Sequence, residues 1–422
     1  MNRLLLAGVA LACLALPAAG SPLERPIHPG WRAGFTPPPD STRLWGRVTL
    51  TDGAVLEGYL RWGHGAGVWA DLLDGTRMPP AELVELARSL TDDAGRLRSV
   101  DYFGIRVSWP EDDFEVARQY TVRFGHLRRL IPDGEEVLLE FRSGERARIE
   151  SGGGDLGPSF RGLEVEGRDG NVRELEWEEI AEVEFAVAPA GSESRHTRLH
   201  GSVTTTDGRR ITGWVGWGSD EIFLDETLDG KEEDEGIAFE EISTIERLDE
   251  GVRVTLVSGE HRTLSGTEDV NADNAGIEVI DPELGRAVVP WRSFASFDLH
   301  PVAPDAARLP EARGVLHGVL VTEDGTRLEG RIVWDADEAT EWEFLNGVWG
   351  RIDVAVEFSR ILRIERTAEG RAELTLRDGR RMTLEGSNDV DASNRGILVL
   401  AADGTGEKVE WVELAHLTFE PR

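Results

Sequence analysis

Cysteine and lysine are almost missing from the 422-residue sequence. Cys13 is its only cysteine, and Lys231 and Lys408 are its only lysines, so 44 of the 46 basic residues are arginine. A single cysteine forms no intramolecular disulfide, and zinc clusters built on cysteine need several thiolates. Both kinds of site are excluded, and the fold must be stabilised by side-chain packing.

The first twenty residues have the pattern of a secretory signal peptide. Arg3 supplies a positive charge, residues 4–16 are almost all apolar, and small residues precede Ser21. Secretory signal sequences share this order of charge, apolar run and small residues. We therefore predict a signal peptide over 1–20, cleavage near Gly20 and Ser21, and a periplasmic or secreted mature protein without cysteine.

Membrane attachment is not expected of the mature chain. The apolar run at 4–16 is shorter than the roughly 20 residues of a transmembrane helix, and no later stretch approaches that length. Ala10 stands where lipidation sites usually carry a bulkier apolar residue, which argues against a lipid anchor on Cys13.

Charge of one sign dominates the sequence. It has 79 acidic residues against 46 basic ones, a formal net charge of −33. Such a field repels nucleic acid and anionic lipid, so neither is expected as a partner. A hydrophobic content of 40% with 13 tryptophans is typical of a globular chain rather than a disordered one.

Three stretches of similar sequence begin long internal repeats. They are VTLTDGAVLEGYLRW (48–62), VTTTDGRRITGWVGW (203–217) and VLVTEDGTRLEGRIVW (319–334). Each has Asp-Gly between two β-like runs, which is a strong signal for a hairpin. Alternate positions up to the final tryptophan are apolar or glycine, so Trp62, Trp217 and Trp334 are predicted to lie in the core.

A second type of unit follows each of these. Its opening hairpins lie at 137–149, 254–264 and 374–384. Both types close on an aromatic residue with apolar residues at +3 and +6, which predicts a tight turn before a last strand. The chain is thus predicted to be six β units of about 50 residues, in alternating types A and B.

The units form three A–B pairs. We predict repeat pair 1 over 43–188, pair 2 over 196–300 and pair 3 over 313–420, with Pro- and Ala-rich linkers between them. Only pair 1 carries an insertion, at 76–121. Its residues 79–90 have helical spacing and 102–109 resemble a strand, and the insertion is either a cap on the array or a functional element.

A hairpin, further strands and a short turn before the last strand resemble the small five-stranded barrels of the SH3-like or Sm-like kind. The resemblance implies an all-β fold of six such barrels in three tandem pairs. It also implies RNA binding, against which the net charge and the signal peptide argue. The alternative is a six-bladed β-propeller, although the alternation of A and B disfavours it.

The loop between the first hairpin and the next strand of the B unit could bind calcium. Oxygen-bearing side chains recur in the second and third copies before a glycine: Asp269, Asn271, Asp273 and Asn274, then Asp389, Asp391, Ser393 and Asn394. Calcium takes six to eight oxygen ligands. The spacing departs from an EF-hand, however, and the first copy keeps only Asp155 and Gly162, so a turn held by Asx hydrogen bonds suits all three copies.

The sequence holds no catalytic motif of a known class, and its nine histidines follow no metal-ligand spacing. No cofactor is expected apart from optional calcium. Five aromatic residues outside the shared positions (Tyr59, Trp69, Trp214, Trp342 and Trp349) form either a surface for sugar rings or contacts between neighbouring repeats, and repeat packing favours the contacts.

We therefore expect an exported, acidic binding or scaffolding protein of the periplasm or cell envelope, not an enzyme, with a protein or glycan as partner. Two alternatives stay open. One is an exported carbohydrate-active or other hydrolytic enzyme with the 76–121 insertion over its site. The other is a calcium-dependent surface binding module.

Overall fold

The computed structural model describes residues 42–78, 99–102, 105–108, 118–151, 154–218, 220–231, 233–301, 314–403 and 405–420. Over these ranges the regular structure is β-strand with short 3-10 turns, and no α-helix occurs. Accordingly, none of the described segments is a helix that could span a bilayer. The chain is all-β, as the alternating hydrophobic patterns predicted.

The strands fall into three sets, one in each repeat pair, which we call module 1 (43–188), module 2 (196–300) and module 3 (313–420). Module 1 contains β1 (Trp45–Leu50), β2 (Val55–Trp62), β3 (Leu72–Arg77), β6 (Arg118–Arg123), β7 (Leu127–Asp133), β8 (Glu136–Phe141), β9 (Arg146–Glu150), β10 (Leu163–Gly167), β11 (Val172–Leu175) and β12 (Ile180–Phe185).

Module 2 contains β13 (His200–Thr205), β14 (Arg210–Trp217), β15 (Thr227–Gly230), β16 (Glu233–Ala238), β17 (Ile242–Arg247), β18 (Val252–Leu256), β19 (His261–Leu264), β20 (Ile277–Asp281), β21 (Gly285–Val289) and β22 (Phe294–Leu299). Module 3 contains β23 (His317–Thr322), β24 (Arg327–Val333), β25 (Phe344–Trp349), β26 (Ile352–Glu357), β27 (Ile361–Ala368), β28 (Arg371–Leu376), β29 (Arg381–Glu385), β30 (Ile397–Leu400), β31 (Gly406–Val409) and β32 (Leu414–Phe419).

A single 3-10 turn precedes the last strand of every A and B unit, as the aromatic pattern predicted. The six turns are η2 (Phe124–His126), η4 (Trp177–Glu179), η5 (Phe239–Glu241), η7 (Trp291–Ser293), η8 (Phe358–Arg360) and η10 (Trp411–Glu413). The aromatic residue that begins each turn is buried in every case. It therefore anchors the turn to the core of its module.

The A and B units of a module share one antiparallel sheet. In module 1 the strand order is β11-β10-β2-β1-β12-β7-β8-β9-β3-β6, and module 3 repeats it as β31-β30-β24-β23-β32-β27-β28-β29-β25-β26. Module 2 has the same pairings, except that its β15–β16 hairpin joins β19 only through a backbone bond from Lys231 to Ser265.

In this order, strands of the A and B units are mixed, because the first hairpin of the A unit pairs with the last strands of the B unit. The sheets are open in this order. The all-β class is confirmed, whereas the closed fifty-residue barrels of the prediction are not. Hairpins are determined by neighbouring residues, but their partners in the sheet are determined by contacts far apart in sequence.

A glycine in the second strand of each module lets two strands approach closely. A Cβ atom on Gly58 would lie 2.2 Å from the carbonyl oxygen of Glu166, and one on Gly213 or Gly330 would meet Ile280 or Leu400 at 2.3 and 2.2 Å. No side chain fits at such distances. The glycines in the alternating pattern thus place β2, β14 and β24 against β10, β20 and β30.

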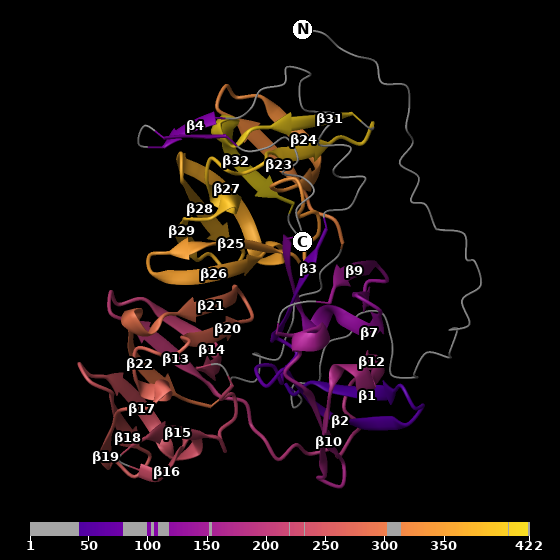
Figure 1. The fold of residues 1–422 in the computed structure, drawn as a ribbon. Helices are drawn as coiled ribbons and strands as arrows, with labels where there is room; N and C mark the ends of the chain where they lie inside the picture. The colour runs from indigo at the N-terminus through magenta and orange to yellow at the C-terminus, as the bar shows by residue number, and fades with distance from the viewer. Residues whose placement is uncertain are drawn as a thin grey trace.

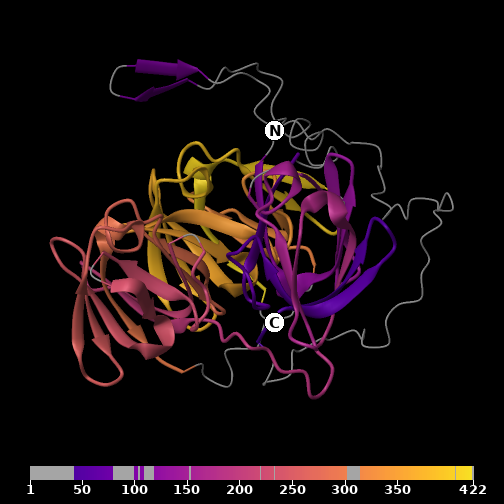
Figure 2. The same ribbon diagram turned by 60° about the horizontal axis from the view of Figure 1, so that its bottom comes forward.

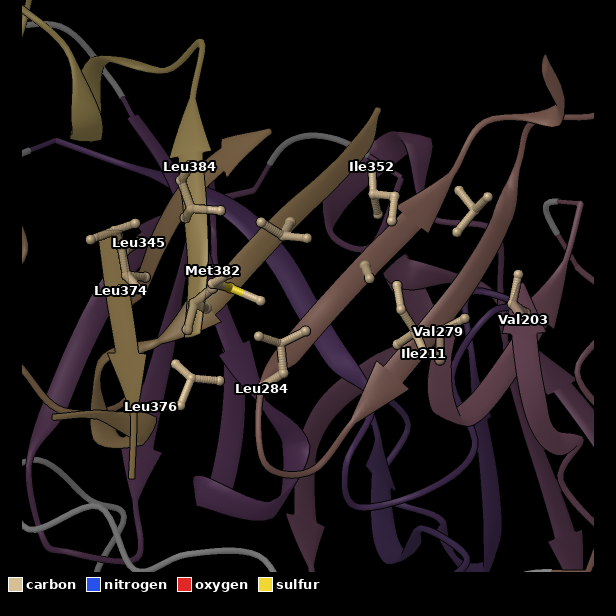
Figure 3. Close-up of a cluster of buried hydrophobic side chains, with 14 of the residues drawn as sticks. Val203, Ile211, Val279, Leu284, Leu345, Ile352, Leu374, Leu376, Met382 and Leu384 are labelled. Atoms are coloured by element: carbon tan, nitrogen blue, oxygen red, sulfur yellow. The ribbon is translucent and has the colours of Figure 1, made fainter. Parts of the chain in front are cut away.

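The tryptophans that end the A repeats lie in the core, as predicted. Trp62, Trp217 and Trp334 are at most 1% exposed. Modules 2 and 3 share one continuous hydrophobic core, whereas most of module 1 forms a core of its own. Figure 3 shows side chains of modules 2 and 3 in one layer, with Leu284 of module 2 between Met382 of module 3 and Val279 of module 2.

The three modules surround a common junction (Figures 1 and 2). At the junction a hydrophobic cluster takes residues from every module: Val68, Ala70 and Leu72 from module 1, Trp214 and Ile280 from module 2, and Phe344 and Ala355 from module 3. Modules 2 and 3 are also joined by a ladder between β21 and β26, in which Gly285 pairs with Val356.

A fully buried ion pair stands beside this cluster. Arg123 of module 1 lies 2.5 Å from Glu357 of module 3, and neither side chain is exposed. The Arg123 guanidinium also donates hydrogen bonds to the carbonyl oxygens of Ala70 and Asp281. Burial alone would raise the pKa of Glu357, but Arg123 and His126 hold it well below its ordinary value.

Three further ion pairs join modules through one repeated acidic position. The residue nine places after the core tryptophan is acidic in each copy, and its carboxylate accepts two backbone N–H groups of its own loop. Each of these carboxylates also binds an arginine of another module: Asp71 binds Arg198, Glu226 binds Arg61, and Glu343 binds Arg77.

The insertion in module 1 is only partly described. The helix predicted over 79–90 lies outside the described residues. The single strand predicted over 102–109 is instead an antiparallel hairpin of β4 (Ser99–Tyr102) and β5 (Ile105–Ser108).

We predict that Arg123→Met lowers the free energy of unfolding by about 3–5 kcal/mol, because it leaves the Glu357 carboxylate buried without its main partner. Urea denaturation with far-UV circular dichroism measures the loss. The control is Arg253→Met, whose ion pair with Glu246 is half exposed, and it should change stability by less than about 0.5 kcal/mol. Equal losses in the two variants would contradict the role of the buried pair.

Candidate functional site

The aspartate shared by all three B-unit loops connects the two units of its module. Its backbone carbonyl accepts the indole N–H of the core tryptophan, in the pairs Asp155–Trp62 at 2.9 Å, Asp269–Trp217 at 2.9 Å and Asp389–Trp334 at 3.1 Å. Its carboxylate accepts a backbone N–H from the A unit, from Asp74, Asp229 and Asn346 respectively. One loop residue therefore binds both the core and the A unit.

The other predicted calcium ligands form turns in the structure. In module 2, Asn271 accepts the N–H of Asp273 at 2.6 Å, and Asn274 accepts that of Gly276 at 2.8 Å. In module 3, Asp391 accepts from Ser393 at 2.8 Å, and Asn394 from Gly396 at 2.9 Å. These side-chain oxygens thus point at the backbone of their own loop.

The first copy of the loop uses an aromatic residue in place of the Asx residues. Phe160 is 7% exposed and packs against Trp62 and Trp177, with ring centroids 5.0 and 5.5 Å away. The glycine that precedes the next strand is in the left-handed region in every copy: Gly162 at φ 98°, Gly276 at 119° and Gly396 at 104°. The left-handed glycine is therefore common to all three modules, whereas the Asx hydrogen bonds expected in all three copies are found in modules 2 and 3 and not in the described part of the first loop.

One predicted calcium ligand, Asp389, belongs to a different acidic group. Ligand atoms of Asp335, Glu338 and Asp389 all lie within 4.8 Å of one another. Burial raises the pKa of all three carboxyl groups. Sequence reasoning missed Asp335 and Glu338 because they follow Trp334 in the A unit, about 50 residues before the loop, and acidic residues are abundant throughout the chain.

A cavity of about 270 Å³ lies between modules 1 and 2. Module 1 contributes Asp74 at the middle of β3, Asp155 of the B-unit loop and Arg161 to its wall. Module 2 contributes Glu278 from β20 and Arg286 from β21. The side chains alternate along these strands, so the charged residues face the cavity while their neighbours fill the cores.

Arg286 is the central cation of the cavity. It forms an ion pair with Asp74 and lies 4.0 Å from Glu278. Burial would raise the pKa of Asp74, but Arg286 and the Thr121 hydroxyl lower it below the ordinary value. Asp74 is therefore ionised at neutral pH.

Two other carboxyl groups of the cavity are less well compensated. Burial raises the pKa of Glu278 to about 7, although Arg286 opposes the change. Burial likewise raises the pKa of Asp155 to about 6. The cavity thus has less positive charge than its carboxylates require, a condition that a bound cation would relieve.

The aromatic residues considered for sugar stacking are buried, with one partial exception. Tyr59, Trp69, Trp214 and Trp342 are at most 6% exposed. Trp342 of module 3 stacks on Phe141 of module 1, with ring centroids 4.5 Å apart. Trp349 is half-buried, and Arg209 of module 2 lies over its ring. Tyr59 and Trp69 belong to the core of module 1, whereas Trp214, Trp342 and Trp349 pack between modules.

Comparisons with known proteins return no relative. No family model matches the chain, no curated protein matches its sequence, and no solved structure matches its fold.

We predict that Glu278→Gln changes the pH dependence of stability. The folded pKa of about 7 exceeds the unfolded value of about 4.3, so the folded state retains a proton that the unfolded state loses. The stability that this group contributes is present below about pH 4.3 and is lost as the pH rises to about 7. The Tm of Glu278→Gln, relative to that of the wild type, should therefore increase between about pH 5 and pH 8.

Differential scanning fluorimetry over that pH range measures the difference. The control is Glu246→Gln, an exposed position in the same module. Its Tm relative to the wild type should stay constant with pH. A constant difference for Glu278→Gln as well would show that this carboxyl is not shifted.

Proposed function

We propose that the protein is an exported binding or scaffolding protein of the periplasm or cell envelope, and that the cavity between modules 1 and 2 binds a small cationic ligand. The observation that carries the proposal is the excess of carboxylates in this cavity. Five line it, namely Asp71, Asp74, Asp155, Asp220 and Glu278, against two arginines, Arg161 and Arg286.

An ammonium or guanidinium group would complement this wall. Asp74 is already paired with Arg286, and Asp71 with Arg198. A ligand cation near Glu278 and Asp155 would stabilise their ionised forms, whose formation burial now opposes. Clefts between domains are frequent ligand sites, and about 270 Å³ suits a small molecule rather than a polymer.

The scaffolding part of the proposal rests on how the modules are joined. The pair of Arg123 and Glu357, which solvent does not reach, connects modules 1 and 3, and the ladder between β21 and β26 connects modules 2 and 3. Such a body presents its outer surface in one fixed arrangement, which suits a protein or glycan partner. The signal-peptide pattern at 1–20 supports export.

We further propose that each half of the shared strand order is an SH3-like unit formed by exchange of strands between A and B. The halves in module 1 are β11, β10, β2, β1 and β12, and then β7, β8, β9, β3 and β6. Each has five strands, and a 3-10 turn precedes β7 and β12. These features support the resemblance noted in the sequence.

The second candidate function is an exported hydrolase. Asp74 is held ionised while Glu278 and Asp155 have raised pKa values, and carboxyl groups whose pKa values differ in this way serve as paired acid and base in hydrolases. The cavity also lies at the strand that leads into the 76–121 insertion. Turnover of a glycan or ester substrate, lost in Asp74→Asn, would favour this function.

We expect agmatine and putrescine to bind the wild-type protein at neutral pH, and Glu278→Gln to weaken binding at least about tenfold, the usual effect of removing a charged hydrogen-bond partner. Isothermal titration calorimetry measures both. Glu246→Gln is the control and should bind as the wild type does. No binding by the wild type, or equal binding by Glu278→Gln, would contradict the cavity as the ligand site.

A further inference from the structure

We propose that module 3 contains a divalent-cation site formed by Asp335, Glu338 and Asp389. Their carboxylate oxygens lie within 4.8 Å of one another, and Asp335 and Asp389 are 0% and 2% exposed. The proposal is independent of the cavity between modules 1 and 2. It shares only Asp389 with the loop ligands that the sequence suggested.

An unsatisfied oxygen atom points to a missing partner. The Oε2 atom of Glu338 is buried, and no hydrogen-bond donor reaches it. A buried carboxylate oxygen without a partner is costly, because folding removes the water that would solvate it. Since Glu338 stands within reach of the other two carboxylates, a cation between the three would supply the missing contact.

The carboxylates of this group and its surroundings carry two more negative charges than the neighbouring arginines balance. Arg395 lies 2.8 Å from Asp335 and 2.5 Å from Asp337, and Arg118 lies 3.3 Å from Asp337. Across the described ranges, Glu338 and Asp389 form no ion pair of this kind. Four carboxylates thus meet two guanidinium groups, and one divalent cation would balance the remainder.

The spacing and the ligand type favour calcium. All three ligands are carboxylates, which hard cations prefer. Ligands on opposite sides of Ca²⁺ lie about 4.8 Å apart, twice a distance of about 2.4 Å, against about 4.2 Å for Mg²⁺. The separations within the group, none above 4.8 Å, accommodate Ca²⁺, which takes several carboxylates in one site, whereas Mg²⁺ usually binds one or two and keeps several waters. A small cavity of about 20 Å³ borders Glu338 and has space for one water molecule.

The number of carboxylates at these positions increases from module 1 to module 3. Module 2 has Glu221 at the position of Glu338, and its Oε2 atom is likewise buried without a hydrogen-bond partner, but Gly218 stands at the position of Asp335, so a third carboxylate is missing there. Module 1 has Ala66 and Gly63 there. Both glycines adopt positive φ, and Asp335 adopts it too, at 46°. Module 3 therefore carries a carboxylate at a position where the backbone conformation favours glycine and is strained for other residues.

Terbium luminescence tests the site on the full mature chain. The backbone of Asp389 is hydrogen-bonded to the Trp334 indole, so Tb³⁺ at the site lies close enough to be sensitised by excitation of that ring. After treatment with a chelator, the wild-type protein should bind Tb³⁺ at one equivalent. Calcium should displace it at lower concentration than magnesium, and calcium should raise the Tm.

Glu338→Gln should weaken calcium binding at least tenfold, as judged by displacement of Tb³⁺, because it removes a ligand charge at almost the same volume. The matched control is Glu221→Gln, the equivalent residue of module 2, which should bind as the wild type does. Asp391→Asn, which changes the loop but not the group, should also bind normally and so separates this site from a loop site.

Three results would overturn the proposal: no calcium-dependent change in the wild type, unchanged binding by Glu338→Gln, or equal losses in Glu338→Gln and Glu221→Gln. A circular dichroism spectrum of Glu338→Gln like that of the wild type shows that the variant folds. If Glu338→Gln alone raises the Tm while the wild type binds no calcium, the carboxyl groups hold protons and not a metal.

Discussion

The arrangement of the three modules depends on one buried carboxylate, that of Glu357. It has no access to water, so its charge requires the guanidinium of Arg123 from another module. Arg123 in turn donates a hydrogen bond to the backbone carbonyl of Asp281 in module 2. If either side chain moved away, a charge would be left in a hydrophobic junction. Together with the ion pairs of Asp71 with Arg198, Glu226 with Arg61 and Asp74 with Arg286, this junction holds modules 1 and 2 around their cavity.

The repeats share a fold but differ in charge at equivalent positions, and these differences determine which module binds which. The residue before the closing aromatic of the A unit is Arg123 in module 1, Ala238 in module 2 and Glu357 in module 3. Only the residues of modules 1 and 3 have opposite charges and can form an ion pair. Because arginine keeps its charge when buried, it suits such contacts better than lysine. The shortage of lysine in the sequence accords with this use of guanidinium groups.

Local features of the fold could be predicted from the sequence. The Asp-Gly hairpins, the buried Trp62 and its equivalents, and the turn before each last strand all follow from patterns within a few residues. The pairing of β1 with β12 could not be predicted, because no local pattern specifies a partner so distant. The candidate sites were missed for a related reason. Glu278 and Asp335 are ordinary acidic residues in a chain rich in them, and only the fold brings them near other carboxylates.

The shared sheets also affect the order in which the chain can fold. Gly46 pairs with Phe185, so the first hairpin of module 1 has no complete sheet to join until nearly the whole module has been synthesised. Contacts of such long range slow folding, because the connecting chain must be ordered before the contacts form. A protein that crosses a membrane as an extended chain benefits from this delay. In the export that we propose, the pairing of the first hairpin with the last strands would keep each module unfolded until its last strand had crossed the membrane.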